Sequence, residues 1–138
     1  EPMAEVLKNL GVKHALIVFG DDRLDELSIS STSSVCEIKD GKITKYKIDP
    51  EKLGLSLYSK DDIVGGTADE NAVITRDILE GKEQGAKRDI VLLNAGAALY
   101  TIGKAATIKE GVEIARQAIE SGKALEKLDE FIQYTNAC

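Results

Sequence analysis

The sequence predicts an α/β domain that begins with a helix and a buried strand, continues through a β-hairpin and ends in a helical half. Three observations support this prediction. An amphipathic pattern leads through a short turn into an apolar run at 14–19, Asp40-Gly41 separates two short strand patterns, and helix-start signals recur in the second half. The 138 residues, of which 43% are hydrophobic and 30% charged, suit one globular domain.

The first predicted helix covers residues 2–10 and leads into the apolar run. Pro2 suits the first helical position and Gly11 suits the position past the helix end. The apolar residues that recur at helical spacing are Met3, Val6, Leu7 and Leu10. Residues 14–19 show little alternation, as in a strand covered on both faces, and this order of elements favours a parallel sheet. The other strands would come from the hairpin or from a preceding segment of the polypeptide.

The predicted hairpin is centred on Asp40-Gly41, a strong signal for a two-residue turn. Such a turn places Ile38 opposite Ile43. In the same register, Val35 lies opposite Tyr46. The second strand is rich in lysine, so we expect it to lie at a solvated edge of the sheet.

The second half of the chain is predicted to be helical. The segments 67–70 and 107–110 read "TADE" and "TIKE", and both match the capping box that starts a helix. These helices are expected to end near Gly81 and Gly122. Between them, residues 88–103 are apolar almost all round, as in a buried central helix. An amphipathic pattern from Ala124 onward predicts a terminal helix.

Composition excludes several classes of protein. The net charge of −6 argues against nucleic acid as a partner, because phosphate binding needs clustered Lys and Arg. The longest apolar runs fall short of the ~20 residues that cross a bilayer, so no membrane partner is expected. Cys36 and Cys138 are the two cysteines, which is no disulfide framework and favours a reducing cytoplasm. The chain begins "EPMAE" without an initiator methionine, so we expect it to be part of a longer protein.

The acidic segment "GDDRLDELS" directly follows the predicted buried strand. It contains Asp21, Asp22, Asp25 and Glu26. Ligand sites in open α/β sheets lie at the carboxyl ends of strands, and carboxylate oxygens suit hard cations such as Mg²⁺. Two interpretations remain open from the residues alone: a metal site, or a solvated loop of the kind in which most acidic side chains lie.

Four further candidates carry weaker signals. Gly65-Gly66 precedes a helix and could admit a phosphate, but two glycines alone are a weak signal and no Lys follows, which favours a tight turn feeding the helix cap. His14 lacks the neighbours that a catalytic histidine needs, which favours a strand-edge role. Asn94 lies within the apolar helix pattern and is expected to be a hydrogen-bonded structural amide. Nothing near Cys36 in sequence would lower its pKa, so it is expected to be inert.

The order of four segments resembles the C-terminal part of anthranilate phosphoribosyltransferases. The segments are "HALIVFGDDRLDELS", "VGGTADENA", "RDIVLLNAGAALYTIGKA" and "GVEIARQAIESGKALEKL", and together they span nearly the whole chain. The resemblance implies transfer of phosphoribosyl from phosphoribosyl pyrophosphate to anthranilate, with release of pyrophosphate, in tryptophan biosynthesis. It also implies Mg²⁺ as cofactor, a homodimer, and residues 1–138 as the C-terminal segment of the phosphoribosyltransferase α/β catalytic domain.

The resemblance assigns two metal ligands to this chain and no catalytic residue. The Asp-Glu pair of the family's "GLDE" motif falls on Asp25 and Glu26, which leaves Asp21 and Asp22 without an assigned role. The family often has His at the position of Phe19 and commonly Gly at that of Arg23. A glycine there would permit a positive φ that arginine resists, which leaves the loop's shape open.

Other parts of the family's site do not occur in this sequence. These are a Gly-Thr-Gly-Gly-Asp phosphate loop, a Lys-His-Gly-Asn segment, an upstream arginine for anthranilate, and the N-terminal helical domain. We therefore expect the isolated chain to be inactive. Two alternatives stay open: part of a pyrimidine nucleoside phosphorylase-like enzyme, which needs no metal pair, and a non-catalytic binding or assembly module.

Overall fold

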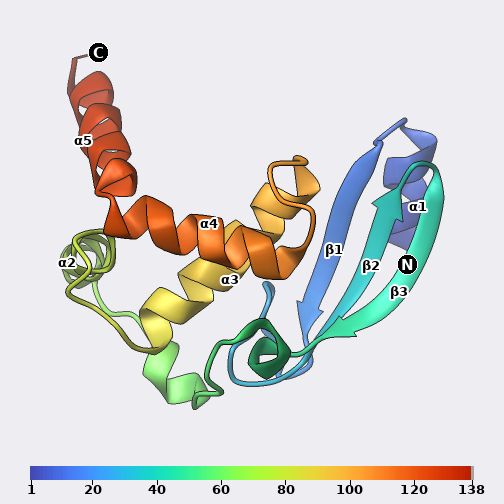
Figure 1. Ribbon diagram of the computed structural model, residues 1–138, viewed down its shortest axis with the longest axis horizontal. Helices are drawn as coiled ribbons and strands as arrows, with labels where there is room; N and C mark the ends of the chain where they lie inside the picture. The colour runs from blue at the N-terminus through green and yellow to red at the C-terminus, as the bar shows by residue number, and fades with distance from the viewer. Residues whose placement is uncertain (138) are drawn as a thin grey trace.

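The computed structural model describes residues 1–137 and has the predicted order of elements (Figure 1). A short helix and a three-stranded sheet are followed by two 3₁₀ turns and four α-helices. The elements are α1 Pro2–Asn9, β1 His14–Gly20, β2 Ser33–Lys39, β3 Lys42–Ile48, η1 Pro50–Leu53, η2 Lys60–Ile63, α2 Ala68–Leu79, α3 Ala86–Thr101, α4 Ile108–Glu120 and α5 Lys123–Asn136. In the residues described, no helix is long and apolar enough to cross a membrane.

The strand arrangement corrects part of the prediction. The strands lie in the order β1-β2-β3 and both pairs are antiparallel, so the expected parallel sheet is wrong for the strands of this chain. The reason is topological: the segment 21–32 turns back on itself and returns β2 along β1 instead of crossing over through a helix. Since β1 pairs on one side only within residues 1–137, its residues are half-buried, and Phe19 is 51% exposed. Residues of β1 nevertheless pack on both faces, against the main core on one side and against the cluster under α1 on the other, so the expected covering of both faces is found, but it is incomplete.

The hairpin follows the predicted register. Val35 lies opposite Tyr46 and Ile38 lies opposite Ile43. Asp40 and Gly41 have φ of 50° and 75°, the left-handed pair that a type I′ turn requires. The predicted solvated edge is β3, most of whose residues are exposed.

The two faces of the sheet are covered differently. One face packs against α3 and contributes Leu16, Val18 and Val35 to the main core, whose centre includes the fully buried Leu92 and Leu93. The other face is partly covered by α1, through a small cluster around Ala4, Cys36 and Ile38.

Most of the apolar stripe predicted for α1 does not pack against this chain, and Leu7 is the one member of it that is partly buried against the sheet. Met3, Val6 and Leu10 are 63%, 57% and 76% exposed, whereas Ala4 is fully buried. The period of the helix was predicted from the sequence, but the face in contact with the sheet was predicted only in part. Ala4 packs there because its small side chain allows α1 to lie close to β2.

Helices α3 and α4 cross at a contact between two glycines (Figure 1). A Cβ placed on Gly111 would lie 2.2 Å from the carbonyl oxygen of Gly96. A Cβ on Gly96 would lie 2.5 Å from the backbone nitrogen of Val112. The two helix backbones therefore touch, and no side chain other than hydrogen fits at either position.

The capped helix starts occur where the sequence placed them. At α2, Thr67 and Glu70 form a reciprocal capping box. At α4, the Thr107 hydroxyl accepts the Glu110 amide proton, but the Glu110 carboxylate accepts from the amide of Ala106 instead of from Thr107. Helix α5 has no fully buried residue and extends from the body in Figure 1, although Asp129 pairs with Arg76 of α2 at 3.0 Å.

Candidate metal-binding loop

The acidic loop leaves the carboxyl end of β1 through a tight turn. The amide of Gly20 donates to the carbonyl of Leu24 at 2.9 Å, and the amide of Arg23 donates to the carbonyl of Gly20 at 2.8 Å. A Cβ on Gly20 would lie 2.6 Å from the Asp22 carboxylate. The turn therefore requires a residue without a side chain at position 20.

Arg23 adopts a positive φ, which arginine ordinarily resists. Its φ is 75°, in the left-handed region where glycine is favoured over residues that carry a Cβ. Its side chain is exposed and forms no ion pair with any residue among 1–137. The loop thus keeps the backbone geometry expected for glycine, with an arginine that has no compensating contact.

Asp21 is held by three side chains from neighbouring strands and the loop. Lys47 and Ser34 donate to its carboxylate at 2.8 Å each, and the Thr32 hydroxyl donates as well. The hydrogen bonds from Lys47, Thr32 and Ser34 lower the pKa of Asp21 to about 2. Asp21 is therefore ionised and already paired within the fold.

Asp22 organises the interior of the loop. The hydroxyls of Ser28 and Ser30 both donate to its Oδ2, and the amide of Leu24 donates to Oδ1 at 3.3 Å. Partial burial works to raise the pKa of Asp22, but these hydrogen bonds outweigh it and the pKa is lowered. Lys60 of η2 donates to the Asp22 carbonyl at 2.9 Å and ties the loop to the next segment.

Asp25 and Glu26 differ from the first two acids because no side chain pairs with them. Both residues are exposed, and neither forms a hydrogen bond or ion pair through its carboxylate within the described chain. Although the Glu26 side chain is exposed as a whole, nearby protein atoms partly desolvate its carboxyl group, and this desolvation, followed by the nearby charge of Asp25, raises the pKa of Glu26. Two adjacent acids with no cationic partner form a local concentration of negative charge that a cation would relieve.

These two carboxylates fit part of a magnesium site. Mg²⁺ in proteins usually keeps several waters and is bound by one or two carboxylates together with phosphate oxygens of a substrate. Asp25 and Glu26 supply two such carboxylates, at the end of a strand. Residues 1–137 contain no group of three or more His, Cys, Asp or Glu side chains arranged to hold a metal ion. The remaining ligands would have to come from water, a substrate or another part of a protein.

Asn94 reaches the loop from α3. Its Oδ1 accepts the amide proton of Leu27 at 3.0 Å, and its Nδ2 donates to the Leu27 carbonyl at 3.0 Å and to the Ile90 carbonyl at 3.1 Å. The sequence predicted a hydrogen-bonded structural amide here, and these contacts confirm it. The sequence did not indicate that the partner would be the residue next to Glu26.

The two glycines before α2 support the turn interpretation. The amide of Gly66 donates to the Asn71 side chain at 2.9 Å, and the Thr67 amide donates to Glu70 at 2.7 Å. A Cβ on Gly65 would lie 2.5 Å from the Asn71 carboxamide oxygen. These amides at the start of α2 are occupied by the helix's own side chains.

A buried polar cluster joins the sheet to α3, and the sequence did not predict it. The Glu37 carboxylate contacts His14 at 2.9 Å and accepts from the Tyr100 hydroxyl at 2.7 Å. Burial works to raise the pKa of Glu37, but hydrogen bonds from Tyr100, His14 and Tyr46 outweigh it and lower the pKa. His14 therefore lies at the edge strand in a structural contact, as predicted. The period-two spacing of His14, Leu16 and Val18 was the available signal that these residues share one face.

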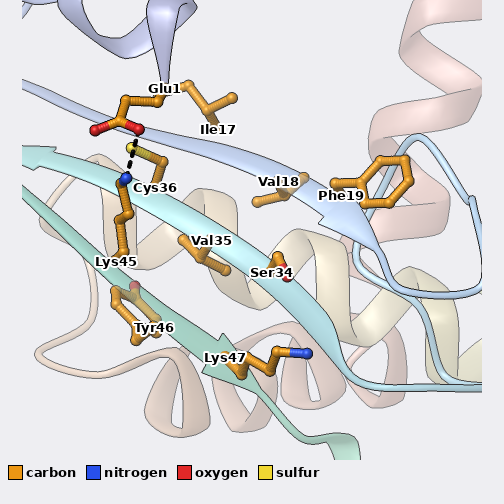
Figure 2. A pocket seen from close by; sticks show the side chains of 10 residues that line it. All are labelled: Glu1, Ile17, Val18, Phe19, Ser34, Val35, Cys36, Lys45, Tyr46 and Lys47. Atoms are coloured by element: carbon orange, nitrogen blue, oxygen red, sulfur yellow. Dashed lines mark ion pairs between the residues drawn. The ribbon is translucent and has the colours of Figure 1, made fainter.

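A groove of about 490 Å³ lies on the sheet face away from α3, and Figure 2 shows the side chains that line it. Its wall includes Ile17, Phe19 and the buried free thiol of Cys36, and Glu1 pairs with Lys45 at 2.6 Å along it. The lining is mostly apolar and lacks a cluster of reactive groups. Lys45 lies opposite Cys36 across β2 and β3, and the expectation that Cys36 is inert stays a prediction.

Comparison with known proteins identifies the family to which the chain that carries this loop is similar. The family model described as "Glycosyl transferase family, a/b domain" matches residues 1–125. Among curated proteins, the chain is 52% identical over 137 residues to the anthranilate phosphoribosyltransferase of Methanobrevibacter smithii, covering 99% of this chain and 41% of that protein. It is 53% identical over 129 residues to that of Clostridium beijerinckii, covering 94% of this chain and 38% of that protein.

Two solved structures are similar over most of the chain. Anthranilate phosphoribosyltransferase from Thermus thermophilus has a TM-score of 0.87 at 38% identity, covering 96% of this chain and 39% of that chain. The Saccharomyces cerevisiae enzyme in complex with PRPP and Mg has a TM-score of 0.82 at 26% identity, covering 91% and 36%. The chain thus spans about two fifths of the length of the relatives it matches. On the family match and these similarities, the chain belongs to the glycosyl transferase family, whose α/β-domain model matches residues 1–125.

Proposed function

We propose that this chain is the C-terminal part of the catalytic domain of an anthranilate phosphoribosyltransferase. The reaction would transfer phosphoribosyl from phosphoribosyl pyrophosphate to anthranilate and release pyrophosphate, with Mg²⁺ bound at Asp25 and Glu26. One observation carries the proposal: of the four acids in the loop, these two alone have no partner among the described residues. Support comes from the similarity to enzymes that carry this name, one of them solved with PRPP and Mg.

Within this proposal the chain's own residues hold and orient the cation. Asp25 and Glu26 provide oxygen ligands, while the anchored Asp21 and Asp22 fix the start of the loop. When bound, Mg²⁺ would neutralise the negative charge that develops on the departing pyrophosphate. The raised pKa of Glu26 agrees with a carboxylate that lacks a positive partner until a cation binds.

The phosphate-cradling segments that the family resemblance implies do not occur in this sequence. The proposal therefore assigns them, together with the anthranilate contacts, to a preceding part of the polypeptide. It also includes a cytoplasmic homodimer for the whole enzyme. The isolated chain is expected to show no turnover of anthranilate, because half a metal site without the opposing phosphate contacts cannot position the substrate.

The test uses the complete polypeptide that carries this chain. The double substitution Asp25→Asn and Glu26→Gln is expected to lower magnesium-dependent turnover of anthranilate by at least about 100-fold, since even the outer partners of metal ligands are worth about 10–100-fold. Asp61→Asn serves as the control, because Asp61 is an exposed aspartate of η2 that forms no ion pair within the described residues.

Two results would contradict the proposal. Unchanged magnesium dependence together with phosphorolysis of a pyrimidine nucleoside would favour the phosphorylase alternative. A complete polypeptide that turns over neither substrate class but binds a partner protein would favour an assembly module.

A further inference from the structure

The carboxamide of Asn94 contacts the backbone of Leu27 as a neighbouring strand would. One oxygen accepts the Leu27 amide proton and one nitrogen donates to the Leu27 carbonyl, both at 3.0 Å. The same nitrogen donates to the Ile90 carbonyl one turn earlier in α3 at 3.1 Å. The Asn94 carboxamide forms all three hydrogen bonds at the same time, which fixes the rotamer of its side chain.

Both ends of this contact are held rigidly. Leu27 is 1% exposed and belongs to the main core, and Asn94 follows Leu92 and Leu93, which are fully buried. The carboxamide therefore connects a core helix to a loop residue whose own side chain is also in the core. This arrangement fixes the backbone immediately after Glu26 relative to α3.

Asp25 and Glu26 have no side-chain partner that could orient them. Asp21 and Asp22 are oriented by hydrogen bonds to their carboxylates, but the second pair lacks such bonds in the part of the chain that is described. The direction in which the second pair points is consequently set by the backbone on either side. On the N-terminal side the Asp22 turn fixes the backbone, and on the C-terminal side Asn94 does.

We propose that Asn94 is a positioning residue for the metal pair, acting through Leu27 to aim Asp25 and Glu26 at one cation. The inference rests on the proposed function, because it assumes that this pair binds Mg²⁺. A residue that only stabilises the core would change the free energy of unfolding and leave metal affinity unaltered. A positioning residue changes metal affinity even when the protein remains fully folded.

The experiment compares metal affinity in the complete polypeptide, with Mn²⁺ as the probe and free Mn²⁺ followed by electron paramagnetic resonance. Asn94→Ala is expected to weaken Mn²⁺ binding about 10-fold or more, as for other residues that orient metal ligands. Tyr100→Phe is the matched control, since it removes a hydrogen bond between α3 and the sheet at Glu37 without touching the loop. The control should lose stability and keep the wild-type affinity for Mn²⁺.

The outcomes separate the inference from the proposed function. Equal Mn²⁺ affinity in the wild type and Asn94→Ala would overturn the role of Asn94 while leaving the metal pair intact. If Mn²⁺ still binds after the double substitution Asp25→Asn and Glu26→Gln, these two residues are not the metal ligands. That result would overturn both the proposed metal site and the role of Asn94.

A second measurement covers the case in which Asn94→Ala does not fold. In the wild type, the side-chain amide signal of Asn94 can be followed by NMR in protein labelled with ¹⁵N-asparagine. Addition of Mg²⁺ should shift this signal with the same midpoint as the backbone signal of Glu26. A signal that stays fixed while Glu26 titrates would overturn the inference.

Discussion

The two halves of the acidic loop contain the same kind of side chain and treat it in opposite ways. Asp21 and Asp22 accept hydrogen bonds from Lys47, Ser34 and Ser28 and thereby become part of the framework. Asp25 and Glu26, three residues further on, have no such partner within residues 1–137. The difference teaches that carboxylates close in sequence take different roles according to the donors around them. The first pair shapes the loop, and the second pair is available to a ligand.

The largest expected effect comes from removing the central anchor. Asp22→Ala would remove the acceptor of the Leu24 amide and of the Ser28 and Ser30 hydroxyls, of which one could then donate to the other at 3.0 Å, and Ser28 is fully buried. Unsatisfied buried groups cost about 1–3 kcal/mol each, so a loss of about 2–4 kcal/mol in the free energy of unfolding is expected. Urea denaturation measures it. Glu26→Ala is the control, and a loss of similar size there would abolish the contrast between the two halves.

The next effect tests the tightness of the turn that separates the pairs. Gly20→Ala would place a methyl group 2.6 Å from the Asp22 carboxylate and 3.0 Å from the Leu24 side chain. Such overpacking costs about 1–3 kcal/mol, which thermal unfolding would detect. Gly54→Ala offers a comparison in which nothing lies within 4 Å of the new methyl group and only the φ of +84° opposes it. Gly20 has no positive φ, so a loss there must come from contact with its neighbours. A loss at Gly54 with none at Gly20 would mean that the neighbouring side chains yield and that the turn is not tight.

A smaller effect is expected at Arg23, and its sign is opposite. The left-handed backbone at Arg23 costs a residue with a Cβ about 1–2 kcal/mol, and Arg23→Gly removes this cost. Part of the gain is lost because glycine has more conformational freedom in the unfolded chain. The free energy of unfolding should rise by up to about 1 kcal/mol. Arg23→Ala keeps the Cβ and should give no gain. A gain with alanine would show that the arginine side chain, not its φ, is unfavourable.

The smallest effect concerns the charge state of the first anchored acid. NMR titration of the Asp21 carboxyl should give a pKa of about 2, against an ordinary value of 3.8. Because the pKa is lowered in the folded state, its contribution to stability is present above pH 3.8 and is lost as pH falls through about 2. Lys47→Met removes the largest cause and should raise the pKa toward 3.8. An unchanged pKa in that variant would assign the shift to Thr32 and Ser34.

Local features of this fold were predictable from the sequence because they depend on residues close together in the chain. The hairpin register depends on Asp40-Gly41, and the start of α2 depends on Thr67 and Glu70. The acidic loop was also located by sequence, because it directly follows an apolar run. The family resemblance then singled out two of its four acids, and their role as metal ligands remains a proposal.

Features that depend on distant residues were not predictable in the same way. Asn94 is 67 residues from Leu27, and Tyr100 is 63 residues from Glu37, so no local pattern encodes these contacts. The direction of the sheet was mispredicted because an apolar run shows the burial of a strand and not the orientation of its neighbour. The face that α1 presents to the sheet was predicted only in part for a similar reason: Ala4 and Leu7 make the contact, whereas the larger Met3 and Val6 stay exposed.

The contact between Gly96 and Gly111 has a consequence for how sequence specifies this architecture. At most helix crossings, interlocking side chains determine the angle and distance, and many combinations of shapes can satisfy them. Here the main chains of α3 and α4 touch, and the helices can come this close because neither glycine has a Cβ atom. No change at one site can compensate for added bulk at the other, because the obstructing atoms belong to the peptide backbone. At this crossing the absence of side chains specifies the fold, and glycine is the only residue that fits at either position.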